Sequence, residues 1–381
     1  MSDANKAIEF LQTLKIPEGP KAGQPLKLAK FQRDFVRGAF KKSTSVAVLS
    51  VGRGNAKSAL SGGLALGELM GEWDRQPRRE IVIAARTRDQ ASVVMQYARG
   101  FLAGMDEDIQ QQFTYRQNPR LELEFHGDGG NHLLRGIAAD SKNALGGSPT
   151  LCIMDERGHW PSDKGDDLEA ALLSGLGKRS GRALIISTSA ADDSHSLSQW
   201  IDDPPPGTYV HEHRPPPGLP ADDLDSLLEA NPGAKAGIGS NVQWLQAQAK
   251  RAIARGGSAL SSFRLYNRNE RVSGESRDVL LRVDDWLACE VSELPPREGG
   301  AVVGVDLGGS ASMSAAALYW PNTGRLECFG AFPTSPSLAD RGAADGVRDR
   351  YVEMHGRGEL ITLGDRVVPA GGFLQKIMQQ L

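Results

Sequence analysis

The chain has few cysteines and no long apolar run. Its 381 residues include three cysteines, Cys152, Cys289 and Cys328, which lie far apart and in no paired spacing. We therefore expect neither a disulfide framework nor a zinc site, and a reducing compartment fits best. No stretch approaches the ~20 apolar residues that span a bilayer, and residues 1–5 lack the basic start of a signal peptide. These absences predict a soluble, intracellular protein with no membrane association.

An excess of positive charge is also missing, because the formal net charge is -3. A protein that wraps DNA stably is usually basic overall, whereas a motor that grips and releases DNA needs only a local basic surface. The net charge therefore neither favours nor excludes a protein that binds DNA. Two groups of arginines have a composition that can contact a phosphate backbone, with an ordinary solvated surface as the alternative: Arg75, Arg78 and Arg79, and Arg264, Arg268 and Arg271, the latter interleaved with Phe263 and Tyr266.

Short apolar runs alternate with helical stretches through the first half of the chain. The helices are expected at 31–40, 58–70 and 89–102, from apolar residues that recur on one helix face. Buried strands are expected at 45–50, 81–85, 151–154 and 183–187, and a hairpin of two half-exposed strands at 121–125 and 132–137. Buried strands alternating with helices indicate an α/β fold whose parallel sheet is covered on both faces.

The pattern changes after residue 203. Prolines at 204–206 and 215–217 bound a stretch that cannot be regular helix or central strand. A helix returns at 240–255, and 293–300 is typical of an interdomain linker. Beyond it, strands at 301–305, 315–320 and 326–330 predict a new sheet that opens with a meander. We therefore expect three regions, with boundaries at residues 205 and 298.

Residues 51–58 have the composition of a phosphate-binding loop. They lie between a predicted strand and a predicted helix, the context that makes such a loop credible. Lys57 would reach the terminal phosphates and the Ser58 hydroxyl would bind Mg²⁺, while the backbone of Gly52, Arg53, Gly54, Asn55 and Ala56 would surround the phosphates. Ala56 stands where the standard motif has glycine, so either φ stays negative there or ATP binding is weakened. A Gly-rich surface turn is the alternative.

Two acidic residues follow the apolar run Leu151–Met154, a Walker B pattern. Asp155 would hold Mg²⁺, and Glu156 would orient and activate the attacking water. The alternative is a solvated strand end. We expect the neighbouring His159 and Trp160 to be structural. At the end of the next strand, Ser187, Thr188 and Ser189 would respond to the γ-phosphate and transmit its loss.

Together these motifs resemble the large terminase subunits of tailed phages and prophages. Gln32 resembles the family's adenine-reading Q motif, and Arg53 has the family's spacing of four residues before the Walker A lysine. Segment 83–91 resembles the region after the second ATPase strand, and residues 229–233 and 263–267 resemble the family's linker. Asp155 and Glu156, as the Walker B acids, and residues 187–190, as the coupling motif, then follow in the order that the family has along its chain. The resemblance spans roughly residues 25–320.

The resemblance implies a P-loop NTPase (RecA/ASCE-like) domain over residues 1–205, a linker or lid over 206–298, and a nuclease region over 299–381. The nuclease would have an RNase H-like fold and use Mg²⁺ or Mn²⁺, with Asp306 as its first ligand. Such a site needs clustered carboxylates around two metal ions, and Asp306 alone cannot form it. Since the sequence ends at Leu381, we expect the nuclease part to be incomplete and to cleave little or no DNA.

The expected activity is ATP hydrolysis, with Lys57, Arg53 and Glu156 as its catalytic residues, used to move double-stranded DNA into a procapsid. The resemblance implies a portal protein, a small terminase subunit and a homo-oligomeric ring as partners, in the cytoplasm of a bacterial host. Two alternatives stay open. One is a helicase-like motor with a second RecA-like domain, and the other is a prophage remnant that binds nucleotide without turnover.

Overall fold

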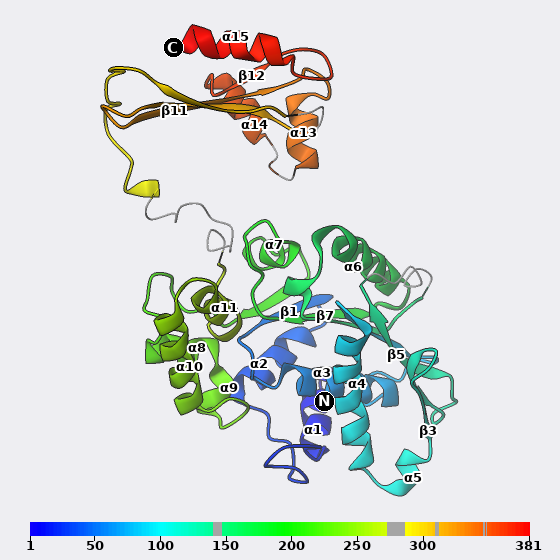
Figure 1. The fold of residues 1–381 in the computed structure, drawn as a ribbon. Helices are drawn as coiled ribbons and strands as arrows, with labels where there is room; N and C mark the ends of the chain where they lie inside the picture. Colours follow the sequence, from blue (N-terminus) through cyan, green and yellow to red (C-terminus); the bar gives the residue numbers. More distant parts are fainter. Residues whose placement is uncertain (140–146, 273–285, 309–311, 346, 348) are drawn as a thin grey trace. The chain divides into compact units, whose positions relative to one another are not determined.

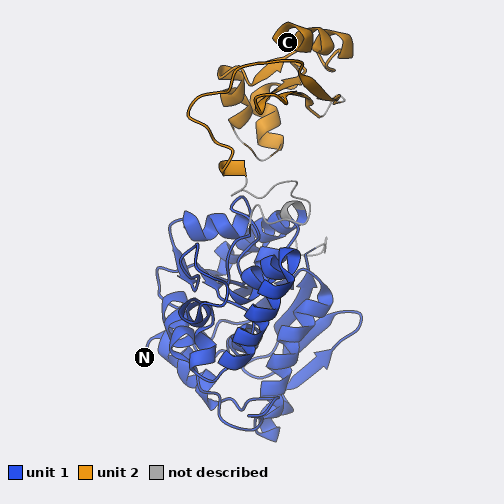
Figure 2. Ribbon diagram, turned by 60° about the vertical axis from the view of Figure 1, so that its left-hand side comes forward, with its two compact units in different colours: residues 1–282 blue, residues 283–381 orange. Residues whose placement is uncertain are grey.

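The computed structural model describes residues 1–381 apart from 140–146, 273–285, 309–311, 346 and 348. The chain forms two compact units, Met1–Arg282 and Val283–Leu381, which Figure 2 distinguishes by colour. Most of the region 206–298, predicted from the sequence as a linker or lid, therefore belongs to the first unit.

An eight-stranded sheet forms the centre of the first unit, in the order β3-β4-β5-β2-β6-β7-β1-β8. The six strands from β5 to β8 in that order run parallel, and β3 and β4 add an antiparallel edge. The predicted parallel sheet is confirmed, and so is the antiparallel pairing of the two half-exposed strands. The strands are β1 Val46–Ser50, β2 Glu80–Ala85, β3 Phe113–Arg116, β4 Leu121–Phe125, β5 His132–Ala138, β6 Leu151–Asp155, β7 Arg182–Ser187 and β8 Thr208–Glu212.

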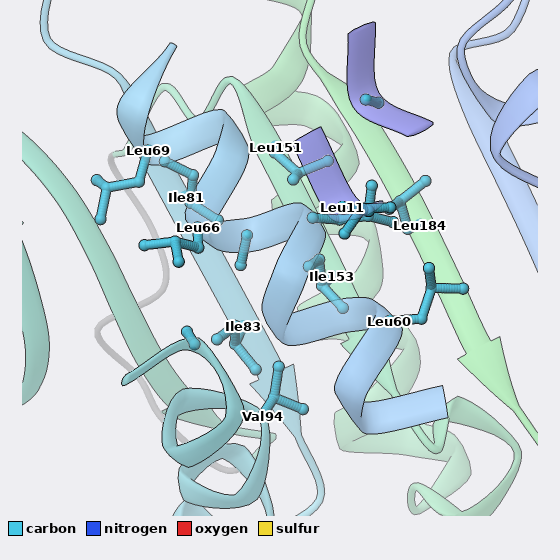
Figure 3. Packing of buried hydrophobic residues seen from close by; sticks show 14 of the residues in the cluster. Leu11, Leu60, Leu66, Leu69, Ile81, Ile83, Val94, Leu151, Ile153 and Leu184 are labelled. Carbon is cyan, nitrogen blue, oxygen red and sulfur yellow. The ribbon is translucent and has the colours of Figure 1, made fainter. Parts of the chain in front are cut away.

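Helices cover both faces of this sheet (Figure 1). Alternate residues of each central strand point to opposite faces, so Ile81, Ile83 and Ile153 join one core cluster while Val82 and Met154 join the other. Figure 3 shows the first cluster, in which leucines of α3 pack on the sheet. The first face carries α1 Asp3–Thr13, α2 Lys30–Ala39, α3 Lys57–Met70 and α4 Arg88–Ala103, and the second carries α6 Ser162–Leu176 and α7 Ser196–Asp202.

Two strands of this sheet, β3 and β8, are not expected from the sequence. β8 lies between the two proline clusters and pairs with β1 in parallel register from Val46–Thr208 to Ser50–Glu212. It is the last strand in the order, so the prolines flank an edge strand, where they are tolerated. The sheet of the first unit thus continues beyond residue 205.

After β8 the chain folds into a small group of helices in the same unit. The helix predicted at 240–255 is confirmed, and the Asn241 side chain caps it by accepting a hydrogen bond from the Trp244 N–H at 2.7 Å. The group consists of α8 Leu224–Ala230, α9 Pro232–Lys235, α10 Val242–Arg255 and α11 Gly257–Asn267, and a short helix α5 Glu107–Gln110 lies earlier in the chain.

The second unit contains a four-stranded sheet in the order β12-β11-β10-β9. β9, β10 and β11 form the predicted antiparallel meander, and β12 adds to β11 in parallel. Phe373 and Ile377 of α15 pack against Ala316 and Ala331 to form a separate core. The elements are β9 Val302–Asp306, β10 Ser314–Trp320, β11 Arg325–Phe332, β12 Leu360–Thr362, α13 Leu338–Ala344, α14 Arg350–Gly356 and α15 Ala370–Gln380.

Candidate nucleotide-binding site

The predicted phosphate loop has the expected strand–loop–helix geometry. β1 ends at Ser50 and α3 begins at Lys57. The buried Lys57 ammonium donates a hydrogen bond to the Val51 carbonyl at 3.0 Å and forms an ion pair with Glu156 Oε1 at 3.1 Å. The two residues most important to the expected chemistry, 99 positions apart in the sequence, are therefore in direct contact.

A cavity of about 1130 Å³ opens beside this ion pair. Its volume lies slightly above the range of ~300–1,000 Å³ that is usual for ligand pockets. Its walls include seven of the predicted site residues, namely Gln32, Arg53, Gly54, Ala56, Lys57, Ser58 and Glu156. Segments 16–28 and 236–239 complete it, and Lys21 Nζ donates to the Gly237 carbonyl at 2.8 Å to join them. The cavity walls do not include the other predicted site residues of this unit, namely Gly52, Asn55, Asp155 and the coupling residues.

Glu156 is held by the coupling motif. Its Oε2 accepts hydrogen bonds from the Thr188 backbone N–H at 3.1 Å and from the hydroxyls of Ser187 and Thr188 at 3.4 Å. Burial acts to raise the pKa of Glu156, but the charge of Lys57 and the hydrogen bond from the Thr188 N–H help to outweigh it, so the pKa is lowered. Glu156 is therefore an ionised carboxylate in contact with both Lys57 and the coupling motif.

Asp155 has the opposite character. It is buried, and its Oδ1 has no hydrogen-bond partner in the part of the chain that the structure describes. Burial, and next the charge of Glu156, raise the pKa of Asp155 to about 7, although Lys57 acts to lower it. A buried carboxylate oxygen without a partner is costly. This orphaned oxygen beside Lys57 fits a residue that takes part in binding Mg²⁺.

Two residues of the site have left-handed backbone conformations. Ala56 has φ 55° and Glu156 has φ 51°. The sequence leaves open whether φ stays negative at Ala56; it does not. A side chain in this region costs about 1–2 kcal/mol, and such strain is typical of functional sites. Gly54, with φ 84°, avoids that cost, and a Cβ there would lie 2.4 Å from the Ser240 hydroxyl.

The Arg53 side chain lies on an aromatic ring rather than on the Lys57–Glu156 pair. Its guanidinium carbon is 3.7 Å from the ring centroid of Tyr266, a cation–π contact. Its backbone N–H donates to the Tyr266 carbonyl at 2.7 Å. Arg53 therefore lines the cavity while the α11 end holds it.

Asn55 and Gln32 use their amides partly within the protein. Asn55 Nδ2 donates to the Gly52 carbonyl at 2.8 Å, and Asn55 Oδ1 accepts from the Gly233 N–H at 2.8 Å. The Asn55 side chain is thus occupied by contacts within the protein, and only the Asn55 backbone fits the predicted role in binding phosphate. Gln32 Oε1 accepts from the Ala29 N–H at 3.0 Å, so this buried side chain is fixed at the cavity wall.

Three asparagines that the sequence does not single out brace the site. Asn231 accepts from Asn55 Nδ2 at 3.0 Å and donates to the Asn267 carbonyl at 2.6 Å. Asn269 accepts from the Ser189 N–H at 2.7 Å. Asn231 and Asn267 lie in segments 229–233 and 263–267, which resemble the terminase linker, but only long-range contacts reveal their role.

His159 is bonded to the coupling motif, with its Nε2 at 2.6 Å from Thr188 Oγ1. Burial lowers the pKa of His159 to about 4, so it is neutral near pH 7. These contacts give it a positioning role.

Most arginines of the two candidate DNA-binding groups are committed to internal contacts. Arg268 is fully buried and donates to the carbonyls of Leu219 and Pro220. Arg271 binds Asp193 and Asp202. In the other group Arg79 is buried against Asp128, which leaves Arg75 and Arg78 exposed. Arg268 and Arg271 therefore do not form a phosphate-gripping surface, because their side chains hold the fold together.

Asp306 is the last residue of β9 and is exposed. Among the residues that the structure describes, no group of three or more His, Cys, Asp or Glu side chains could hold a metal ion. The nuclease role of Asp306 stays a prediction.

No helix in the described parts of the chain is long and apolar enough to cross a membrane.

Comparisons with known proteins agree with these features. The family model for the terminase large subunit, ATPase domain, matches residues 34–201. The terminase large subunit of Enterobacteria phage HK97 is 30% identical over 334 residues, which are 83% of this chain and 62% of that protein. The crystal structure of the HK97 bacteriophage large terminase matches with a TM-score of 0.62 and 27% identity, over 100% of this chain and 78% of that one. The chain thus spans less than two thirds of its curated relative. The chain is therefore similar to terminase large subunits, and its residues 34–201 match the family's ATPase domain.

Proposed function

We propose that this chain hydrolyses ATP to drive double-stranded DNA into a phage procapsid. The contact of Lys57 with Glu156 carries the proposal, because it places a cation for the phosphates 3.1 Å from a carboxylate that can act on water. The cavity beside this pair and the family's ATPase domain support it.

Each site residue then has a defined task. Lys57 and the backbone of residues 52–56 would neutralise and surround the phosphates, and Gln32 would contact the adenine. Glu156 would orient the attacking water and accept its proton. Arg53 would leave the Tyr266 ring to stabilise charge at the γ-phosphate. Ser187, Thr188 and Ser189 would sense the loss of that phosphate through Glu156.

Ser58 and Asp155 are the residues that would hold the Mg²⁺ that accompanies ATP. The orphaned oxygen of Asp155 is the observation that fits this role. A bound divalent ion would supply charge neutralisation of the phosphate oxygens. Because Asp155 is buried, its carboxylate has little contact with bulk water.

The partners and location follow from the same proposal. The DNA contact would be independent of sequence. The portal protein, the small terminase subunit and further copies of this chain in a ring would be its partners, in the bacterial cytoplasm and on the procapsid. The second unit would belong to an RNase H-like endonuclease that cuts concatemeric DNA, with Asp306 as a ligand of Mg²⁺ or Mn²⁺.

The helicase alternative is less well supported. It requires a second RecA-like domain, whose sheet would be parallel, whereas the sheet of the second unit opens with an antiparallel meander. The alternative of a nucleotide-binding remnant without turnover draws on the strain at Ala56.

Measurement of steady-state ATP hydrolysis, with and without linear double-stranded DNA and portal protein, tests the proposal. We expect turnover that Lys57→Ala reduces at least about 100-fold. Lys250→Ala, on the exposed surface of α10, is the matched control and should hydrolyse ATP like the wild type. Nucleotide binding without Lys57-dependent turnover under all these conditions would instead establish the remnant.

A further inference from the structure

The end of α11 contacts the two loops that face the phosphate site. Residues 266–269, the bracing segment, are more than 200 positions from the phosphate loop in the sequence. The Tyr266 carbonyl accepts from the Arg53 N–H at 2.7 Å, and its ring carries the Arg53 guanidinium. The Asn267 carbonyl accepts from Asn231, which in turn binds Asn55. The bracing segment is thus attached to the phosphate loop.

Asn269 attaches the same segment to the ends of three adjacent strands. Its Oδ1 accepts from the Ser189 N–H at 2.7 Å, and its own carbonyl accepts from the Ser189 hydroxyl at 2.6 Å. Its Nδ2 donates to the Ser50 hydroxyl at 2.9 Å and to the His213 carbonyl at 3.0 Å. Ser50 is the last residue of β1, and Ser189 and His213 come just after β7 and β8, so the partners lie at the ends of three strands that are neighbours in the sheet.

The backbone conformation suits an asparagine at this position. Asn269 is fully buried and has φ 55°, a left-handed conformation that asparagine tolerates better than most residues. Every polar atom of its side chain has a partner among the four contacts above. The residue is therefore held in one orientation, as a positioning role requires.

A second path joins Glu156 to the bracing segment. Thr188 binds Glu156 and also contacts His159. The His159 ring lies 5.3 Å from the Tyr266 ring, measured between centroids. The segment then continues to Val272, whose N–H donates to the Ala191 carbonyl at 2.9 Å, just after the coupling motif. The coupling motif is thus in contact with residues 266–272 through both Thr188 and Ala191.

From these contacts we infer that Asn269 is a positioning residue, which fixes the coupling motif against the phosphate loop and transmits the nucleotide state to residues 266–272. The inference rests on the proposed ATPase function. It assigns Asn269 no contact with the substrate. Its effect comes from the positions of Ser189, in the coupling motif, and of Ser50, at the end of the strand that leads into the phosphate loop.

Hydrogen exchange followed by mass spectrometry tests this without relying on turnover. In the wild type we expect a non-hydrolysable ATP analogue to slow amide exchange both in residues 51–58 and in residues 264–272, and ADP to slow the second region less. In Asn269→Gly, which retains the left-handed backbone, the analogue should still protect 51–58 but no longer affect 264–272.

Two further variants separate positioning from folding. Asn269→Asp keeps the acceptor for Ser189 but loses the donor to His213, so we expect an intermediate response; this near-isosteric variant also serves if the glycine variant does not fold. Asn241→Gly, a helix cap outside the site, is the matched control and should behave as the wild type. In ATP hydrolysis, Asn269→Gly should lower kcat about 10-fold while KM changes less than about threefold.

The outcomes distinguish the two proposals. Protection of 51–58 without any response of 264–272 in the wild type would overturn the role of Asn269, and so would an unchanged response and kcat in Asn269→Gly. Absence of protection at 51–58 in the wild type would overturn the nucleotide-binding function itself.

Discussion

Asp155 and Asp306 each end a strand, but their surroundings differ. Asp155 ends β6, is 5% exposed, and lies beside Lys57 and Glu156. Asp306 ends β9 and is exposed. Among the described residues, the non-glycine positions with positive φ all lie in the first unit, and two of them, Ala56 and Glu156, directly adjoin Lys57 and Asp155 in the sequence. Burial, a neighbouring cation and a strained backbone thus distinguish Asp155 from Asp306, although both acids end a strand.

The largest effect should come from Glu156→Gln, which keeps the shape but cannot accept a proton or pair with Lys57. We expect ATP turnover to fall by about 10²–10⁴-fold, measured by phosphate release. Binding of a fluorescent ATP analogue should remain within about threefold of the wild type. Turnover within threefold of the wild type would remove Glu156 from the mechanism and weaken the contrast with Asp306.

Asp155→Asn should stabilise the nucleotide-free protein. The pKa of Asp155 is raised from 3.8 to about 7, so below pH 4 the favourable contribution of the protonated side chain is fully present, and it is lost as pH rises to 7. We expect the variant to exceed the wild type at pH 8 by roughly 1–3 kcal/mol in free energy of unfolding, and by less at pH 5. Urea denaturation at both pH values measures this.

The same variant should need at least about tenfold more Mg²⁺ for half-maximal ATP hydrolysis, because a neutral amide is a poorer ligand than a carboxylate. A titration with Mg²⁺ measures it. An unchanged Mg²⁺ requirement together with unchanged stability would mean that Asp155 is no more specialised than Asp306.

Ala56→Gly should release the strain at the phosphate loop and raise the free energy of unfolding by about 1 kcal/mol. Ala59→Gly, three residues later within α3, is a control of opposite sign, because glycine in a helix interior costs about 0.5–1 kcal/mol. Thermal denaturation of both variants provides the test. A loss of stability in both would show that the left-handed conformation at Ala56 is not strained.

Asp306→Asn should have the smallest effect. The side chain is exposed, so we expect a change within about 0.5 kcal/mol in the free energy of unfolding and unchanged ATP hydrolysis. Matched to Asp155→Asn, it makes the same chemical change at the end of a strand. A clear loss of stability would show that Asp306 has a structural role that its exposure conceals.

Local sequence patterns predicted the elements that carry the chemistry. Val46–Ser50, Lys57 and Leu151–Glu156 were identifiable because buried strands and the loop between strand and helix have short-range signatures. β8 was not, since its five residues lie between prolines and its pairing with β1 is a long-range contact.

The braces of the site were equally hidden. Asn231 binds Asn55, 176 positions away, and Asn269 binds Ser189, 80 positions away. Arg268 looked like a surface cation because sequence does not reveal that its guanidinium is buried against the carbonyls of Leu219 and Pro220. Residues of this kind depend on tertiary contacts rather than on a periodic pattern.

The placement of β8 also bears on how the protein behaves at high concentration. An unpaired outer strand can recruit a strand from another molecule and start aggregation. β8 exposes its free side over only five residues, Thr208–Glu212, between Pro204–Pro206 and Pro215–Pro217. Proline has no N–H to extend such a ladder. The prolines thus limit the length over which a strand of another molecule could pair with β8. A short pairing edge benefits a protein that is expected to work in crowded assemblies.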